Sequence, residues 1–131
     1  MVFVVQRKSQ VEEILELRDE QGNLAHSLSV KLDVEKIAPA LYKARKELIE
    51  AQNKANAAEA YEDIGAKEMA FFKIVFGEEN ANLICEFYDG KYTEMLLDIT
   101  PFITEVIYPK INQISNQKME QLKAARRKMK K

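Results

Sequence analysis

The chain has 131 residues, of which 47% are hydrophobic and 31% charged, and this is the composition of one globular domain and not of a disordered protein. Its single cysteine, Cys85, excludes a disulfide within the chain and fits a reducing compartment. No stretch approaches the roughly 20 apolar residues that span a bilayer, and the apolar start at residues 1–5 lacks a basic region and a cleavage site, so we expect neither a membrane span nor a signal peptide.

Charge is unevenly distributed along the sequence, although the formal net charge is only −1. Residues 118–131 contain seven basic residues and one acidic residue, which gives this segment a net charge of +6. The 117 residues before it contain 13 basic and 20 acidic residues, a net charge of −7. Such a basic end is either a solvated helix end or an electrostatic handle for an acidic partner.

The first third of the chain predicts a β-hairpin with strands at residues 11–18 and 24–32. The second strand alternates apolar and polar residues, and its apolar side carries Leu28, Val30 and Leu32. Between the strands, Gly22 and Asn23 tolerate the positive φ angles that a short hairpin loop needs. Residues 2–5 are a candidate third strand.

A long helix is expected over residues 39–60, with Pro39 in its first turn and a separate short turn at residues 34–37 capped by Asp33. Apolar residues recur along it at alternating spacings of four and three, in a coiled-coil-like stripe: Ile37, Leu41, Ala44, Leu48, Ala51, Ala55 and Ala58. Because alanine buries little area, this stripe suits the close approach of a second helix. We therefore expect self-association, or a docked client helix, along Leu48, Ala51, Ala55 and Ala58, with Tyr61 at the edge.

Four further helices are expected in the second half of the chain. Gly65 should interrupt the helical pattern just before the first of these helices. Gly77 should end the first helix, and Gly90 should end the second. Thr93 should cap the third of them, a short helix that ends at Ile99.

The last helix should open at residues 100–101, where Thr100 acts as cap and proline occupies the first turn, and it should kink at Pro109. The whole chain then forms one mostly α, α+β domain, residues 1–131. It divides into a hairpin region at 1–33, a helical body at 34–117 and a basic tail at 118–131 whose end frays.

The search for catalytic chemistry finds no constellation that supports an enzyme. His26 is the only histidine and lies on a predicted strand with no nucleophile beside it, and Cys85 lies in an apolar helix without a cationic neighbour. One histidine and one cysteine cannot form a tetrahedral zinc site within one chain. We expect no enzymatic activity, no metal and no cofactor.

Aromatic residues gather in the second half of the chain, where eight large rings fall within 38 residues: Phe71, Phe72, Phe76, Phe87, Tyr88, Tyr92, Phe102 and Tyr108. Core packing accounts for most of them, but a small helical domain does not easily bury so many. We expect Phe87, Tyr88 and Tyr92 to contribute to a partner-binding face.

Three runs in this half resemble a known family: the turn at residues 76–80, the run Phe-Tyr-Asp-Gly-Lys-Tyr-Thr-Glu-Met-Leu-Leu-Asp-Ile at 87–99, and Pro-Phe-Ile-Thr-Glu-Val-Ile-Tyr-Pro-Lys-Ile at 101–111. Together with the basic tail, they are similar to the tail assembly chaperones of long-tailed bacteriophages and prophages of Gram-positive bacteria. The resemblance is close over about a third of the chain, and its motifs are packing motifs.

The resemblance implies a protein that binds the tape measure protein in the host bacterial cytoplasm before the tail tube polymerises around it. It also implies a longer form, made by ribosomal frameshifting, that recruits tail tube subunits. Two other interpretations remain open: a nucleic-acid-binding helical protein that uses the basic tail, and a structural or regulatory subunit from a mobile element. The tail lacks interleaved aromatic residues, which disfavours single-stranded nucleic acid as its partner.

Overall fold

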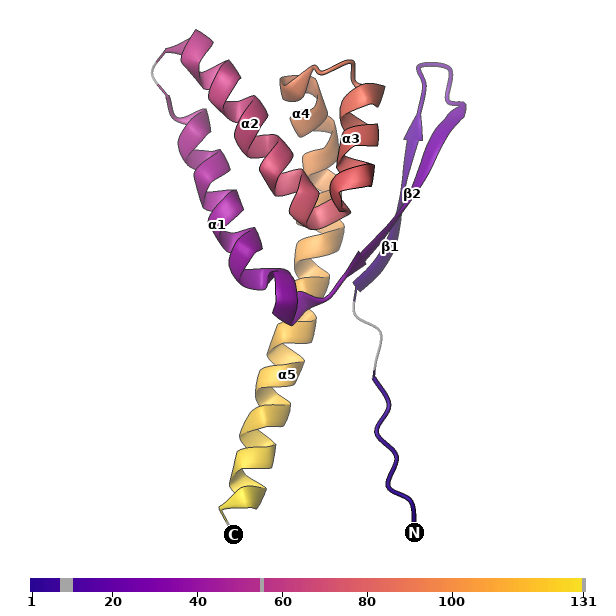
Figure 1. The fold of residues 1–131 in the computed structure, drawn as a ribbon, viewed down its shortest axis with the longest axis vertical. Helices are drawn as coiled ribbons and strands as arrows, with labels where there is room; N and C mark the ends of the chain where they lie inside the picture. Colours follow the sequence, from indigo (N-terminus) through magenta and orange to yellow (C-terminus); the bar gives the residue numbers. More distant parts are fainter. Residues whose placement is uncertain (8–10, 55, 131) are drawn as a thin grey trace.

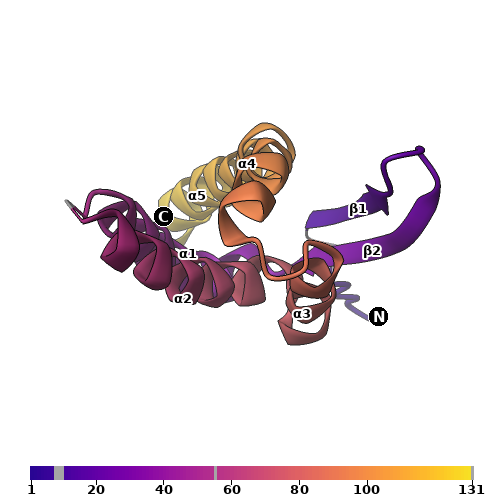
Figure 2. The same ribbon diagram turned by 90° about the horizontal axis from the view of Figure 1, so that it is seen from above.

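The structure, a computed structural model, describes residues 1–7, 11–54 and 56–130. An antiparallel hairpin of two strands precedes a set of helices, of which the last is long and kinked (Figure 1). Seen from above, the hairpin lies beside α3, on the opposite side of the molecule from α1 (Figure 2). This arrangement confirms the predicted fold class.

The hairpin joins β1 (Val11–Arg18) to β2 (Leu24–Leu32), with the strand bounds that the sequence pattern predicts. Its turn is held by the Asp19 carboxylate, which accepts hydrogen bonds from the backbone N–H groups of Gln21 and Asn23 at 3.0 and 2.9 Å. Gly22 lies between them with φ +84°, a conformation that strains any residue with a Cβ. One face of the hairpin is buried, and it consists of Val11, Leu17, Leu28, Val30 and Leu32.

The candidate third strand at residues 2–5 is not formed in the structure, and that prediction is wrong. These residues are exposed and have no strand assignment, and the sheet of the described residues has two strands. A four-residue apolar segment gains strand structure only where a sheet edge offers hydrogen bonds, and residues 2–5 pair with neither strand of the described sheet.

Helix α1 (Val34–Gln52) begins before Pro39, so the predicted separate turn at residues 34–37 is wrong. The expected cap is present, since the Asp33 carboxylate accepts from the Lys36 N–H at 3.4 Å. Pro39 lies in the second turn, where its missing N–H removes one hydrogen bond near the start of the helix. Buried Val34 stabilises this first turn against the core.

Helix α2 (Ala57–Phe76) runs beside α1 in the opposite direction, and a short connection separates the two (Figure 1). The long helix expected to reach residue 60 therefore ends at Gln52. Asn56 caps α2, its side-chain oxygen accepting from the N–H groups of Ala58 and Glu59 at 2.9 and 3.2 Å. An asparagine side chain bonds readily to the free N–H groups at a helix start, and here this local preference ends one helix and begins another despite the alanine pattern.

Gly65 does not interrupt a helix, as the sequence suggested, but lies buried in the middle of α2. Helix α2 is the centre of the fold, since it contacts α1, α3, α4 and β2. Its buried side chains on the C-terminal half are Phe71, Phe72, Val75 and Phe76. It ends at Gly77, as predicted, and α3 (Glu78–Phe87) follows directly.

The last helix is continuous from Tyr92 to Met129, so the predicted start at residues 100–101 is wrong. It consists of α4 (Tyr92–Phe102), a wide π-helical turn η1 (Ile103–Ile107) and α5 (Tyr108–Met129). Thr100 does not act as a cap; its hydroxyl donates to the Leu96 carbonyl within the helix. Three isoleucines buried on one side hold the helix together across Pro101: Ile99, Ile103 and Ile107.

The start of α4 also differs from the prediction, because the residue before the helix is Lys91 and Thr93 makes no side-chain cap. In the π turn, the Tyr108 N–H reaches the Ile103 carbonyl five residues back. This widened turn immediately precedes Pro109 and supplies the kink that the proline predicted. Beyond it, α5 stays helical to Met129, where fraying was expected.

We predict that Gly65→Ala destabilises the fold, because Gly65 is where the ring of Tyr92 crosses α2. An added Cβ would lie 2.7 Å from Tyr92 Cδ2, closer than carbon atoms pack. Overpacking of this kind costs about 1–3 kcal/mol, which outweighs the gain of roughly 1 kcal/mol in helix propensity. Urea unfolding should show the loss, and Gly65→Ala combined with Tyr92→Leu should recover part of it. A Gly65→Ala protein as stable as the original would contradict this packing.

Candidate interaction surfaces

The alanine stripe predicted to bind a partner is mostly inside the molecule. Leu48 and Ala51 are buried where α1 packs against α2, with exposed fractions of 5% and 1%. Ala58 and Tyr61 are exposed on the first turns of α2, and Ala55 lies outside the described residues. Among the members of this stripe that the structure describes, the accessible ones therefore lie at the start of α2.

The predicted aromatic residues Phe87 and Tyr88 instead line a groove between the hairpin turn and the start of α4. We call this the acidic groove; its lining is Arg18, Asp19, Glu20, Phe87, Tyr88, Asp89, Lys91, Glu94 and Asp98. The rings of Phe87 and Tyr88 meet edge to face, with centroids 5.1 Å apart. Both side chains are half-buried, so the groove offers apolar contact as well as charge.

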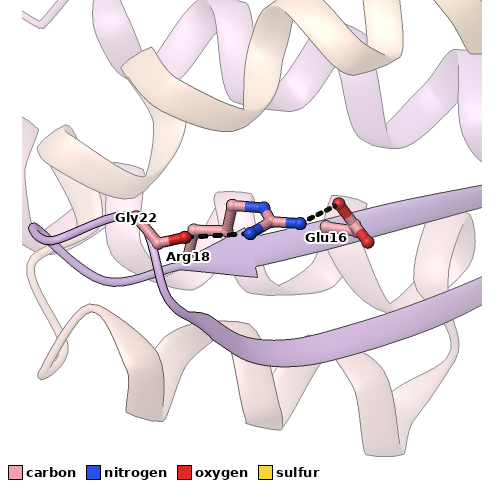
Figure 3. Close-up of polar contacts among 3 residues, drawn as sticks. All are labelled: Glu16, Arg18 and Gly22. Atoms are coloured by element: carbon pink, nitrogen blue, oxygen red, sulfur yellow. Dashed lines mark hydrogen bonds and ion pairs between the residues drawn. The ribbon is translucent and has the colours of Figure 1, made fainter.

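Charge in the acidic groove is predominantly negative, because five carboxylates face two basic side chains. Arg18 is drawn away from these carboxylates, since its guanidinium donates to Glu16 at 3.0 Å and to the Gly22 carbonyl at 2.9 Å (Figure 3). The Tyr88 hydroxyl donates to Asp98 at 3.1 Å. Burial, this hydrogen bond and the charges of Asp98 and Glu94 all raise the pKa of Tyr88, as a negative environment should.

Tyr92, the third aromatic residue predicted to bind a partner, is half-buried over Gly65 and next to Cys85 and Glu68. The electrostatic interaction with the neighbouring Cys85, followed by burial and by the proximity of Glu68, raises the pKa of the Tyr92 phenol. Tyr92 therefore belongs to a packed polar cluster rather than to the lining of the acidic groove.

The sequence analysis missed a second exposed surface, which lies on the outer face of α1. Tyr42 and Ile49 are 70% and 47% exposed, and together with Arg45, Lys46 and Glu50 they line a shallow hollow. The Arg45 guanidinium is fixed 5.3 Å from the centre of the Tyr108 ring, a cation–π contact that ties α1 to α5. The signal was the seven-residue spacing of Tyr42 and Ile49, which the stronger alanine stripe on the other face obscured.

Glu68 is an unusual feature of the core. Its side chain is fully buried, and neither carboxylate oxygen has a hydrogen-bond partner in the part of the chain that the structure describes. Burial raises its pKa from 4.5 to about 8. The carboxyl group is therefore held protonated near neutral pH, and ionising it costs folding free energy.

Neither the comparison with protein-family models nor those with curated proteins and solved structures found a match to this chain. Across residues 1–7, 11–54 and 56–130, no cluster of three or more histidine, cysteine, aspartate or glutamate side chains is arranged to hold a metal ion. No helix within those same residues is both long and apolar enough for a membrane span.

We predict that Glu68 makes stability fall as pH rises between about 4.5 and 8. In this window the native carboxyl keeps its proton while the unfolded one loses it, so the free energy of unfolding drops by about 1.4 kcal/mol per pH unit. Glu68→Gln should remove this slope and stabilise the protein most at pH 8, in urea titrations from pH 5 to pH 8. The matched control is Glu62→Gln, an exposed change on the same helix. Parallel slopes for Glu68→Gln and the original protein would contradict the assignment.

Proposed function

We propose that this chain is a tail assembly chaperone that binds the tape measure protein in the host bacterial cytoplasm before the tail tube polymerises. The proposal is carried by the run of residues 87–111, whose pattern is similar to that of this chaperone family. In the structure this run contains the end of α3, all of α4, the π turn and the start of α5.

The proposed activity requires surfaces and no bond-making chemistry. A chaperone for a long helical client needs an apolar strip to cover the client and charged surroundings that keep the complex dissolved. The outer face of α1 combines these properties, since Tyr42 and Ile49 are exposed one above the other among Arg45, Lys46 and Glu50. We place the client helix along this face.

Weak binding at each copy is sufficient for this function. Many copies on one long client act together, because the client joins their sites into one multivalent array. A shallow face such as that of α1 fits this requirement better than a deep pocket, since each copy must leave when tube subunits arrive. Tail tube subunits would then be further partners, through a longer form of the chain.

The proposal predicts that a tape measure protein is encoded near this gene, and the test is co-purification with that protein. Replacing both Tyr42 and Ile49 by serine should weaken binding roughly tenfold or more, because each removed contact is worth at least about 1 kcal/mol at the centre of an interface. Binding is measured by titrating the labelled client segment, and circular dichroism checks that the double variant stays folded.

Leu97→Ser is the matched control, since Leu97 is 71% exposed but lies on α4. It should bind the client as the original protein does. Failure of the original protein to bind the neighbouring tape measure protein would refute the proposed function. Unchanged binding by the double variant would refute only the placement of the client on α1. Salt-dependent DNA binding by a chain that ignores the tape measure protein would favour the nucleic-acid alternative.

A further inference from the structure

The basic end of α5 extends away from the body of the protein (Figure 1). Every residue from Met119 to Lys130 is exposed, although the helix continues to Met129. Its large apolar side chains are Met119, Leu122 and Met129, which are 54%, 61% and 85% exposed. Their spacings of three and seven place them on one side of the helix, where they form an uncovered apolar seam.

Basic side chains surround this seam. Residues 118–130 carry six basic residues and one acidic residue, and this acidic residue, Glu120, lies 3.6 Å from Lys123 on the same helix. A surface that covers the seam must therefore offer apolar contact and negative charge together.

The acidic groove has both properties. The rings of Phe87 and Tyr88 provide an apolar lining, and carboxylates from the hairpin turn, the α3–α4 connection and α4 surround them. Glu20, Asp89 and Glu94 have no ion-pair partner among the residues that the structure describes. Arg18 is paired with Glu16, so it does not neutralise these carboxylates. The groove therefore has an excess of negative charge.

The groove and the basic end belong to opposite ends of the molecule. Figure 1 shows the hairpin turn and the α3–α4 connection at the top and the end of α5 at the bottom. One continuous helix leads from Tyr92, beside the groove, to Met129, so the basic end cannot fold back into the groove of its own chain.

We propose that the basic end of α5, residues 118–130, docks in the acidic groove of a second copy of this chain. Lysine and arginine side chains meet the groove carboxylates, while the seam of Met119, Leu122 and Met129 covers Phe87 and Tyr88. Repeated from copy to copy, this head-to-tail contact builds a ring or an open array. In an antiparallel dimer the same contact would form twice, once in each groove. The inference does not depend on the proposed function.

Two charge reversals test this contact by sedimentation velocity over a range of protein concentrations. The tail variant is Arg126→Glu with Arg127→Glu, and the groove variant is Glu20→Lys with Glu94→Lys; all four residues are exposed. The original protein should self-associate, more weakly at high salt because the contact is ionic. Each variant should reduce the association constant by roughly tenfold or more, as expected for the loss of complementary charge.

Mixing the two variants should restore association. The groove variant keeps an unaltered basic end, which fits the unaltered groove of the tail variant, and the two reversed surfaces also complement each other. The control is Lys36→Glu with Lys43→Glu, which changes the net charge as much as the tail variant but at exposed positions on α1, and it should associate normally.

Three results would overturn the inference. The first is a protein that stays monomeric at all concentrations, and the second is association that neither variant weakens. The third is a mixture of the two variants that remains monomeric. If the original protein stays monomeric and the tail variant instead loses salt-dependent binding to DNA, or to vesicles of anionic lipid, the basic end serves that partner and the proposed contact is wrong.

Discussion

The packing of four other elements against α2 is the constraint on which the rest of this structure depends. Phe72 is fully buried and meets Phe76 edge to face at 5.4 Å, and Phe76 stacks on Phe102 at 6.1 Å. Because α2 contacts α1, α3, α4 and β2, these elements are arranged around it. The hairpin and α1 consequently lie on different sides of the molecule, each with an outward face. The outer face of α1 and the acidic groove are both consequences of this packing.

The same central helix carries the least favourable feature of the core. Glu68 is buried on α2 without a hydrogen-bond partner in the described residues, and Tyr92 lies beside it and presses against Gly65. A buried carboxyl costs stability as soon as it ionises, and an apolar residue of similar size would avoid that cost. Helix α4 is thus held against α2 by an aromatic ring, a glycine and a protonated acid rather than by apolar contact alone.

The sequence pattern predicted correctly those elements whose bounds depend on neighbouring residues. The alternation of Leu28, Val30 and Leu32 predicted the hairpin, and Gly77 marked the end of α2 because few other residues suit its positive φ. Helix α3 ends at Phe87, three residues before Gly90, where the glycine predicted its end. The errors arose where packing overrides local signals. The last helix continues past Pro101 because Ile99, Ile103 and Ile107 are buried on one side of it. The alanine stripe is interrupted because Asn53 caps the end of α1 and Asn56 caps the start of α2. Nothing in the local sequence pattern predicts the π turn before Pro109.

The interaction surfaces were only partly predictable for the same reason. Phe87 and Tyr88 were identified from an excess of aromatic residues, but their groove also needs Asp19 and Glu20 from a hairpin nearly 70 positions earlier in the chain. Leu48 and Ala51 form a genuine helical stripe, yet a stripe does not reveal whether its partner is another chain or the next helix. Here the partner is α2.

Amide hydrogen exchange on the free protein, in dilute and concentrated solution, tests this account most directly. Amides of residues 71–76 should be the most protected at both concentrations, because opening α2 requires unfolding of everything packed around it. Amides of residues 119–129 should exchange quickly in dilute solution and become protected when the protein is concentrated. Rapid exchange at residues 71–76 would contradict the central role of α2. Equal exchange at residues 119–129 in both samples would contradict the docking of α5 on a second copy.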